Sequence, residues 1–219
     1  MSRLATVAIT AALGIALASV PAVAAAAPAT AAALPLREAV AALPVADEVR
    51  DGYQREKFRH WVDADRDGCS TRAEVLIDEA ALAPEIGLKC AIAGGSWYSS
   101  YDDEYVPDAR AIDIDHMVPL AEAWDSGASA WTAKRREEYA NDLGEARALI
   151  AVTARSNRSK ADQDPSTWLP PYAPAQCGYI TDWVSVKTRW GLTVDDHEKS
   201  VLVERSASCP NVPIAVAIA

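Results

Sequence analysis

The sequence predicts an α+β protein: one mostly helical domain with two disulfides and a small strand–strand–helix unit near its middle. Three observations predict this class. Helical spacing of apolar residues dominates both ends of the chain. Strand-like patterns are confined to 90–118 and 147–152, and the first of these segments combines paired glycines with several aromatic residues. The 4 cysteines are an even number in a chain that starts with an export signal.

Residues 1–27 have the pattern of a secretory signal peptide. Arg3 precedes an unbroken apolar run, and small residues then offer cleavage sites. The alternative is a membrane anchor, but Pro21 interrupts the run and no basic stop-transfer cluster follows. We therefore expect a secreted, extracellular protein without stable membrane association. Residues 28–36, rich in Ala, Pro and Thr, are expected to be a flexible lead-in.

The rest of the chain is long enough for one domain with its own core, predicted over 37–210 with a tail at 211–219. We expect a monomer. No cysteine lies in a C-x-x-C pair, which argues against a zinc knuckle. Four cysteines allow three pairings, and we expect Cys69–Cys90 and Cys177–Cys209 because each closes a local loop.

Residue patterns predict helices over 37–43, 47–61, 71–82, the stretch after Pro119, 130–139, 179–190 and 194–206. The segment 153–161 is polar and compatible with a further helix. A β-hairpin is predicted over 90–106, where glycine and aromatic residues replace helix formers. Strands are predicted over 111–118, where isoleucine alternates with aspartate, and over 147–152.

The formal net charge of −10 argues against a protein that holds nucleic acid by bulk attraction, because phosphate binding needs cations. A nuclease with this charge would have to supply its positive field locally, through metal ions and a small basic patch.

The region 110–160 contains the groups that phosphodiester hydrolysis requires. An imidazole can remove a proton from water near neutral pH, and a divalent cation on oxygen ligands can neutralise the phosphate. Asp115 and His116 are adjacent in the sequence. Asn157 and Lys160 are expected on one face of the helix over 153–161, with two arginines beside them.

Strict strand alternation points Asp115 and His116 to opposite faces. Both can reach one site only if the strand bends or ends near His116, and Pro119 favours that ending.

The motifs in this region occur in a specific order. They are Asp113-Ile-Asp-His-Met-Val-Pro-Leu-Ala-Glu-Ala-Trp124, Tyr139-Ala-Asn-Asp142, Ala151-Val-Thr-Ala-Arg-Ser-Asn-Arg-Ser-Lys-Ala-Asp162 and Asp164-Pro-Ser-Thr-Trp168. From about residue 61 to 209 the chain resembles the secreted HNH endonuclease family. That family belongs to the His-metal finger (ββα-metal) nucleases and is related to the C-terminal domain of GmrSD-type restriction enzymes. The resemblance implies an HNH ββα-metal finger embedded in the helical domain, and a metal-dependent endonuclease acting on DNA, with RNA as an open alternative.

By this resemblance, His116 would be the general base and Asp115 a metal ligand, assisted or replaced by Asp113. Asn157 would be a second metal ligand at a position where relatives have histidine, which favours Mg²⁺ or Mn²⁺ over softer metals. Asn141 would be the middle asparagine that orients the base. The alternatives are a solvent-facing carboxylate for Asp113 and a helix C-cap or turn for Asn141.

Lys160 would be a catalytic contact to phosphate, and Arg158 and Arg155 would bind flanking phosphates. The alternative for this group is a solvated helix face. His60 and His197 lack a motif and are interpreted as structural or surface residues.

An acidic segment at 63–74 matches the calcium-loop spacing D-x-D-x-D-G-x5-E. Its residues are Asp63, Asp65, Asp67, Gly68 and Glu74. Carboxylates this close repel one another unless a cation neutralises them, and predicted helices flank the segment as in an EF-hand. We expect structural Ca²⁺ here. The alternative is an acidic turn that caps the next helix through Ser70 or Thr71.

Two functions are compatible with these features. One is a secreted endonuclease with little sequence specificity, since few aromatic residues are expected near the site. The other is a non-catalytic, calcium-stabilised secreted module on the same scaffold. The intact set of Asp115, His116, Asn157 and Lys160 favours the enzyme.

Overall fold

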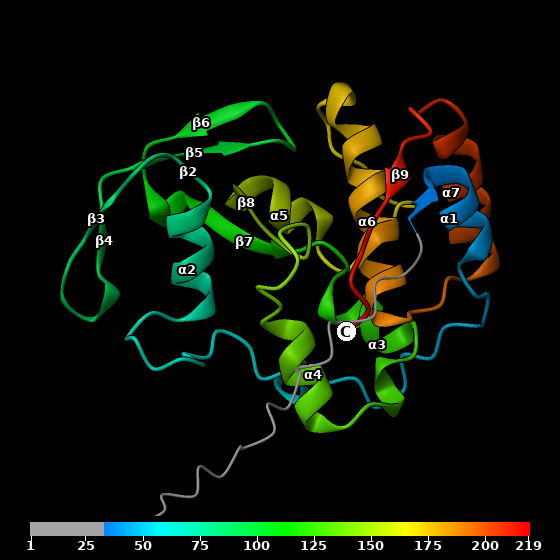
Figure 1. Ribbon diagram of the computed structural model, residues 1–219, viewed down its shortest axis with the longest axis horizontal. Coiled ribbons are helices and arrows are strands. Elements are labelled where there is room, and N and C mark those ends of the chain that lie inside the picture. The colour runs from blue at the N-terminus through cyan, green and yellow to red at the C-terminus, as the bar shows by residue number, and fades with distance from the viewer. Residues whose placement is uncertain (1–32) are drawn as a thin grey trace, which may run out of the picture.

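The computed structural model describes residues 33–219 (Figure 1). The predicted signal peptide and residues 28–32 of the predicted lead-in lie outside the described residues. Within 33–219, no helix has the length and apolar character needed to cross a membrane.

The centre of the molecule is a strand–strand–helix unit. Strand β7 (Ile112–His116) pairs antiparallel with β8 (Leu149–Thr153), in a register that joins His116 to Leu149 and Ile112 to Thr153. Helix α5 (Ala154–Lys160) follows β8 directly and packs against both strands. The Thr153 side chain caps α5 by accepting a hydrogen bond from the Ser156 amide. The two strands and the helix thus occur where the sequence predicts them.

A second layer lies on one side of this unit (Figure 1). Its three-stranded antiparallel sheet has the order β2-β5-β6, and its hairpin is the one predicted over 90–106. The strands are β2 (Ala80–Leu82), β5 (Ser96–Ser99) and β6 (Glu104–Val106), with a smaller pair formed by β3 (Glu85–Ile86) and β4 (Ile92–Ala93). Helix α2 (Thr71–Asp78) joins this layer through the buried Trp97 indole, which donates to the Leu76 carbonyl.

The remaining helices lie on the other side and below, as Figure 1 shows. They are α1 (Leu36–Ala42), α3 (Leu120–Asp125), α4 (Ala133–Ala140), α6 (Gln176–Trp190) and α7 (Asp196–Ala207). Lys187 of α6 is fully buried and its ammonium donates to Glu122 of α3 and Glu198 of α7. One cation therefore ties three helices together.

The packed domain extends beyond the predicted limits of 37–210 in both directions. Strand β1 (Leu34–Pro35) pairs with β9 (Pro213–Ile214), and Leu36 is completely buried. Ile214 and Val216 are buried as well. Their apolar side chains draw the predicted tail, and the end of the predicted lead-in, into the fold.

Both predicted disulfides, Cys69–Cys90 and Cys177–Cys209, are confirmed. The first joins the acidic segment to the chain before β4. The second joins the start of α6 to the end of α7.

The helix predicted over 47–61 does not form. Apart from the 3₁₀ turn Arg55–Lys57, the segment is irregular. Its apolar residues serve tertiary packing instead: Tyr53 and Phe58 lie edge-on to Trp124, whose indole donates to a backbone carbonyl of the segment. The helix that an EF-hand needs before its loop is therefore missing, while α2 follows the loop as predicted.

Candidate active site

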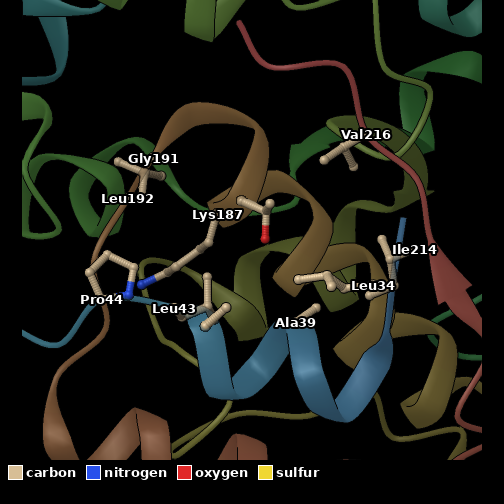
Figure 2. A pocket seen from close by; sticks show the side chains of 11 residues that line it. Leu34, Ala39, Leu43, Pro44, Lys187, Gly191, Leu192, Ile214 and Val216 are labelled. Carbon is tan, nitrogen blue, oxygen red and sulfur yellow. The ribbon is translucent and has the colours of Figure 1, made fainter. Parts of the chain in front are cut away.

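A cleft of about 440 Å³ lies between the irregular 53–55 segment, the end of β7 and helix α5. It is lined by Tyr53, Arg55, Ile114, Asp115, His116, Pro119, Leu120, Ala121, Asn157, Arg158, Ala161 and Asp162. A smaller cavity of about 180 Å³ separates α1 from the end of α6 (Figure 2). Its wall is apolar apart from Lys187 and Thr188, so of these two cavities the larger one has the groups for acid–base chemistry.

His116 ends β7 and is only 6% exposed. Its Nε2 lies 3.0 Å from the carbonyl oxygen of Ala140. Because a carbonyl can only accept, Nε2 must carry the hydrogen, and the lone pair of the neutral ring is then on Nδ1. Nδ1 has no hydrogen-bond partner among residues 33–219, and the ring lines the cleft. This is the tautomer that a proton acceptor in the cleft requires.

Burial lowers the pKa of His116 to about 3, against the opposing effect of the hydrogen bond to Ala140. The positive charges of Arg55 and Lys160 contribute to the same lowering. The imidazole is therefore neutral at physiological pH.

Asn141 fixes the backbone that contacts the His116 ring. Its amide nitrogen donates to the carbonyls of Arg59 and Glu137, and its amide oxygen accepts from the Val62 amide and the Thr71 hydroxyl. Asn141 thereby connects the end of α4 to the 59–62 segment. Ala140, which accepts from His116, is its immediate neighbour, so the side chain acts on the imidazole through the backbone.

Asp115 points to the face of β7 opposite His116, as alternation predicts. Its carboxylate accepts from the Lys160 ammonium at 2.9 and 2.7 Å and from the Tyr101 hydroxyl at 2.6 Å. Lys160 is fully buried and also donates to the carbonyls of His116 and Met117. Its ammonium is enclosed on the inner face of α5, and Lys160 is not part of the cleft lining.

Asp113 and Asn157 meet at the edge of the cleft. The Asn157 amide nitrogen is 3.4 Å from Asp113 Oδ2, and Arg158 Nε is 3.6 Å from the same oxygen. Both contacts are long, so the carboxylate keeps free coordination capacity. A carboxylate and a side-chain amide are hard oxygen donors that fit Mg²⁺ or Mn²⁺. Asp115 fits less well, because its oxygens are already shared between Lys160 and Tyr101.

The two predicted phosphate-binding arginines have different surroundings. Arg158 lines the cleft. Arg155 pairs with Asp102 and Glu104 at 2.8 Å and lies outside the cleft lining.

Three residues that sequence reasoning did not single out also lie near His116. Tyr53 and Arg55 form one wall of the cleft. The Trp61 ring lies over the imidazole, with centroids 5.3 Å apart, on a backbone with φ of 59°. A bulky residue in that left-handed region is rare and often marks a functional site. The sequence does not predict that angle. Because the spacing at 47–61 predicted a helix, it did not indicate that Tyr53 and Arg55 form a wall of the cleft.

The acidic segment brings its aspartates together. Side-chain oxygens of Asp63, Asp65 and Asp67 lie within 4.8 Å of one another. Burial raises the pKa of Glu74, and the negative charges of these aspartates raise it further. A fourth carboxylate is therefore near the three. Ser70 caps α2, as the alternative interpretation also requires.

The fold and cleft define a mixed α/β domain with a buried imidazole beside oxygen donors. Residues 85–205 match the family model for GmrSD restriction endonucleases, C-terminal domain. A protein of Arthroderma benhamiae named "Uncharacterized secreted protein" is 41% identical over 160 residues, covering 73% of this chain and 77% of that protein. No solved structure matches.

The chain belongs to the family of GmrSD restriction endonuclease C-terminal domains. The matched region contains β7, β8, α5 and the cleft residues that they carry. Family membership thus indicates a nuclease-related function and a nucleic-acid substrate.

Proposed function

We propose that this protein is a secreted, metal-dependent HNH endonuclease that hydrolyses phosphodiester bonds of DNA. The unit β7–β8–α5 would be its ββα-metal finger, and His116 its general base. One observation carries the proposal: the Nε2–H of His116 donates to the Ala140 carbonyl, which leaves the Nδ1 lone pair for a water molecule in the cleft.

Residues around the base would have supporting roles. Asn141 positions the base through the backbone of Ala140. Asp113 and Asn157 would hold Mg²⁺ or Mn²⁺. The buried Asp115 would be a further carboxylate beside this pair. The metal would supply positive charge to the phosphate. Lys160, paired with Asp115, would have a structural role: it would hold α5 against the end of β7.

The neutral imidazole suits this chemistry. A protonated ring could not accept a proton from water, and burial keeps the ring deprotonated at neutral pH. When the negative phosphate enters the cleft, its charge would raise the pKa of His116 and so strengthen the base. The Trp61 ring would shield one side of the imidazole from bulk water.

Secretion is supported by three observations. The first 27 residues have a signal-peptide pattern, all cysteines of the described chain are in disulfides, and the fungal relative is named a secreted protein.

The test is cleavage of supercoiled plasmid by the purified mature protein with Mg²⁺, Mn²⁺ or EDTA. We expect nicking that requires the metal and that is lost in His116→Gln. His197→Gln is the matched control, because His197 is exposed on α7 and remote in sequence from the motif. Both variants should melt at the temperature of the parent. A folded protein that cleaves neither plasmid nor RNA with any metal would favour the non-catalytic module.

We also propose that the 63–74 segment binds structural Ca²⁺. The converging oxygens of Asp63, Asp65 and Asp67 and the nearby Glu74 support a hard divalent ion. Gly68 adopts φ of 98°, which permits the sharp turn of such a loop. The Cys69–Cys90 disulfide ties the segment to the chain before β4.

A further inference from the structure

Few cations are free to meet a phosphate in the cleft. The Lys160 ammonium is buried against Asp115, and Arg155 is paired with two acidic residues. Arg158 lines the cleft and has only a long contact to Asp113. Arg55 lines the same cleft from the irregular 53–55 segment, is exposed, and makes no ion pair with any residue in 33–219.

Arg55 is close to the base as well as to the cleft wall. Its charge acts on the His116 imidazole, whose pKa is lowered first by burial and then by this neighbour. Burial raises the pKa of Tyr53, and the adjacent Arg55 guanidinium opposes that shift. Arg55 and His116 line the same cleft, so the guanidinium is a positive charge on the surface that a substrate would meet.

The turn that carries Arg55 is anchored to the core. The Phe58 amide donates to the Arg55 carbonyl, and Phe58 is completely buried against Trp124 and Tyr139. The guanidinium is therefore presented from a fixed backbone. A binding group on a fixed backbone loses less entropy when a ligand arrives.

We propose that Arg55 is a substrate-binding residue that grips a phosphate of the nucleic-acid backbone on the wall of the cleft opposite Arg158. A strand laid across His116 would then be held on both sides of the scissile phosphate, by Arg158 on α5 and by Arg55 on the irregular segment. This inference rests on the proposed function, because it identifies the polyanionic backbone as the ligand of that same cleft.

The overall charge of the protein explains why one arginine matters. With a formal net charge of −10, the surface as a whole repels a polyanion. Under these conditions each unpaired cation facing the substrate carries a large part of the binding. A guanidinium can also hold a phosphate through two parallel hydrogen bonds.

The test measures binding separately from cleavage. A fluorescent DNA duplex is titrated with the His116→Gln protein at several NaCl concentrations. Adding Arg55→Gln should weaken binding about tenfold at low salt and reduce the slope of log K against log salt by about 0.9, the value for one phosphate contact. Arg55→Lys should restore most of the slope. Arg110→Gln is the matched control, because Arg110 is exposed, pairs with Asp108 and lies outside the cleft lining.

The outcomes separate this inference from the proposed function. Unchanged affinity and slope in Arg55→Gln overturn the inference, even if the parent cleaves plasmid. A parent that binds DNA through Arg55 but never cleaves sustains the inference and rejects the nuclease. Loss of binding in Arg110→Gln to the same degree, or a parent that does not bind at all, overturns the assignment of Arg55.

Discussion

The Lys160 ammonium lies 2.7 Å from Oδ2 of Asp115, and both side chains are almost completely buried. Burial lowers the pKa of the lysine and raises that of the aspartate, while the contact between them opposes both shifts. On the same face, the next residue pair along α5 and β7 is Asn157 with Asp113. Two residues of α5 thus contact two aspartates of β7: Lys160 contacts Asp115, and Asn157 contacts Asp113. The buried Lys160–Asp115 pair fixes α5 against β7 and so sets the position of Asn157 and Asp113 at the cleft.

The first prediction follows from that burial. Lys160→Met leaves a carboxylate and two backbone carbonyls without their donor, so the free energy of unfolding should fall by about 3–5 kcal/mol. Urea denaturation followed by tryptophan fluorescence measures it. Lys134→Met is the matched control: Lys134 is exposed and, among residues 33–219, pairs with Glu138 alone, and its loss should leave the midpoint unchanged. Equal midpoints for the two variants would contradict a structural role for Lys160.

The second prediction concerns the proposed metal ligands. Asn157→Ala removes an oxygen donor at the cleft edge and should raise the Mg²⁺ concentration for half-maximal cleavage at least tenfold. Asn157→Asp keeps an oxygen donor and should stay close to the parent. Plasmid nicking is measured across a Mg²⁺ titration, with melting temperatures as the check on folding. If both variants respond to Mg²⁺ as the parent does, Asn157 is not a ligand.

The third prediction is a pH dependence from Glu79. Burial raises the pKa of Glu79 from 4.5 to about 7, although a hydrogen bond from the Ala151 amide opposes the shift. Between pH 4.5 and 7 the folded state then binds more protons than the unfolded state, so stability falls as pH rises through this range. The contribution of this one group is up to about 3 kcal/mol.

Glu79→Gln tests this dependence, because glutamine keeps an acceptor for the Ala151 amide but does not ionise. The free energy of unfolding, measured at pH 5 and pH 7.5, should change less with pH in the variant than in the parent. Asp108→Asn serves as the control, since Asp108 lies on the surface beside Arg110. An identical pH profile for Glu79→Gln and the parent would exclude the carboxyl of Glu79 as the source.

Much of the site follows from local sequence. Alternation in 111–118 predicts that Asp115 and His116 point to opposite faces, and β7 has this geometry. Helical spacing places Asn157 and Lys160 on one face of α5, but spacing does not say that the end of this face at Lys160 is buried. That burial depends on Tyr179 and Trp183 of α6, whose ring centroids lie 6.0 and 5.9 Å from the Lys160 ammonium.

The opposite wall could not be predicted in the same way. The apolar residues Val49, Tyr53, Phe58 and Trp61 have roughly helical spacing. Tyr53 and Phe58 instead pack on Trp124, far along the chain. Tertiary contacts decide the backbone of this segment, so local propensity gives the wrong element.

The last prediction separates the two disulfides by their effect on calcium. Loss of either bridge should cost about 3–4 kcal/mol, since each closes a loop of moderate length. Only Cys69–Cys90 is attached to the acidic segment, where Cys69 donates its backbone amide to Asp67.

In the parent, Ca²⁺ at one hundred times its Kd should stabilise the fold by about 2.7 kcal/mol. Cys177→Ser/Cys209→Ser should keep this increment, measured as a rise in melting temperature. Cys69→Ser/Cys90→Ser and Asp65→Asn should each lose most of it, because the bridge orders the loop and Asp65 supplies one of its converging oxygens. A calcium increment retained in Asp65→Asn would mean that the ion binds elsewhere.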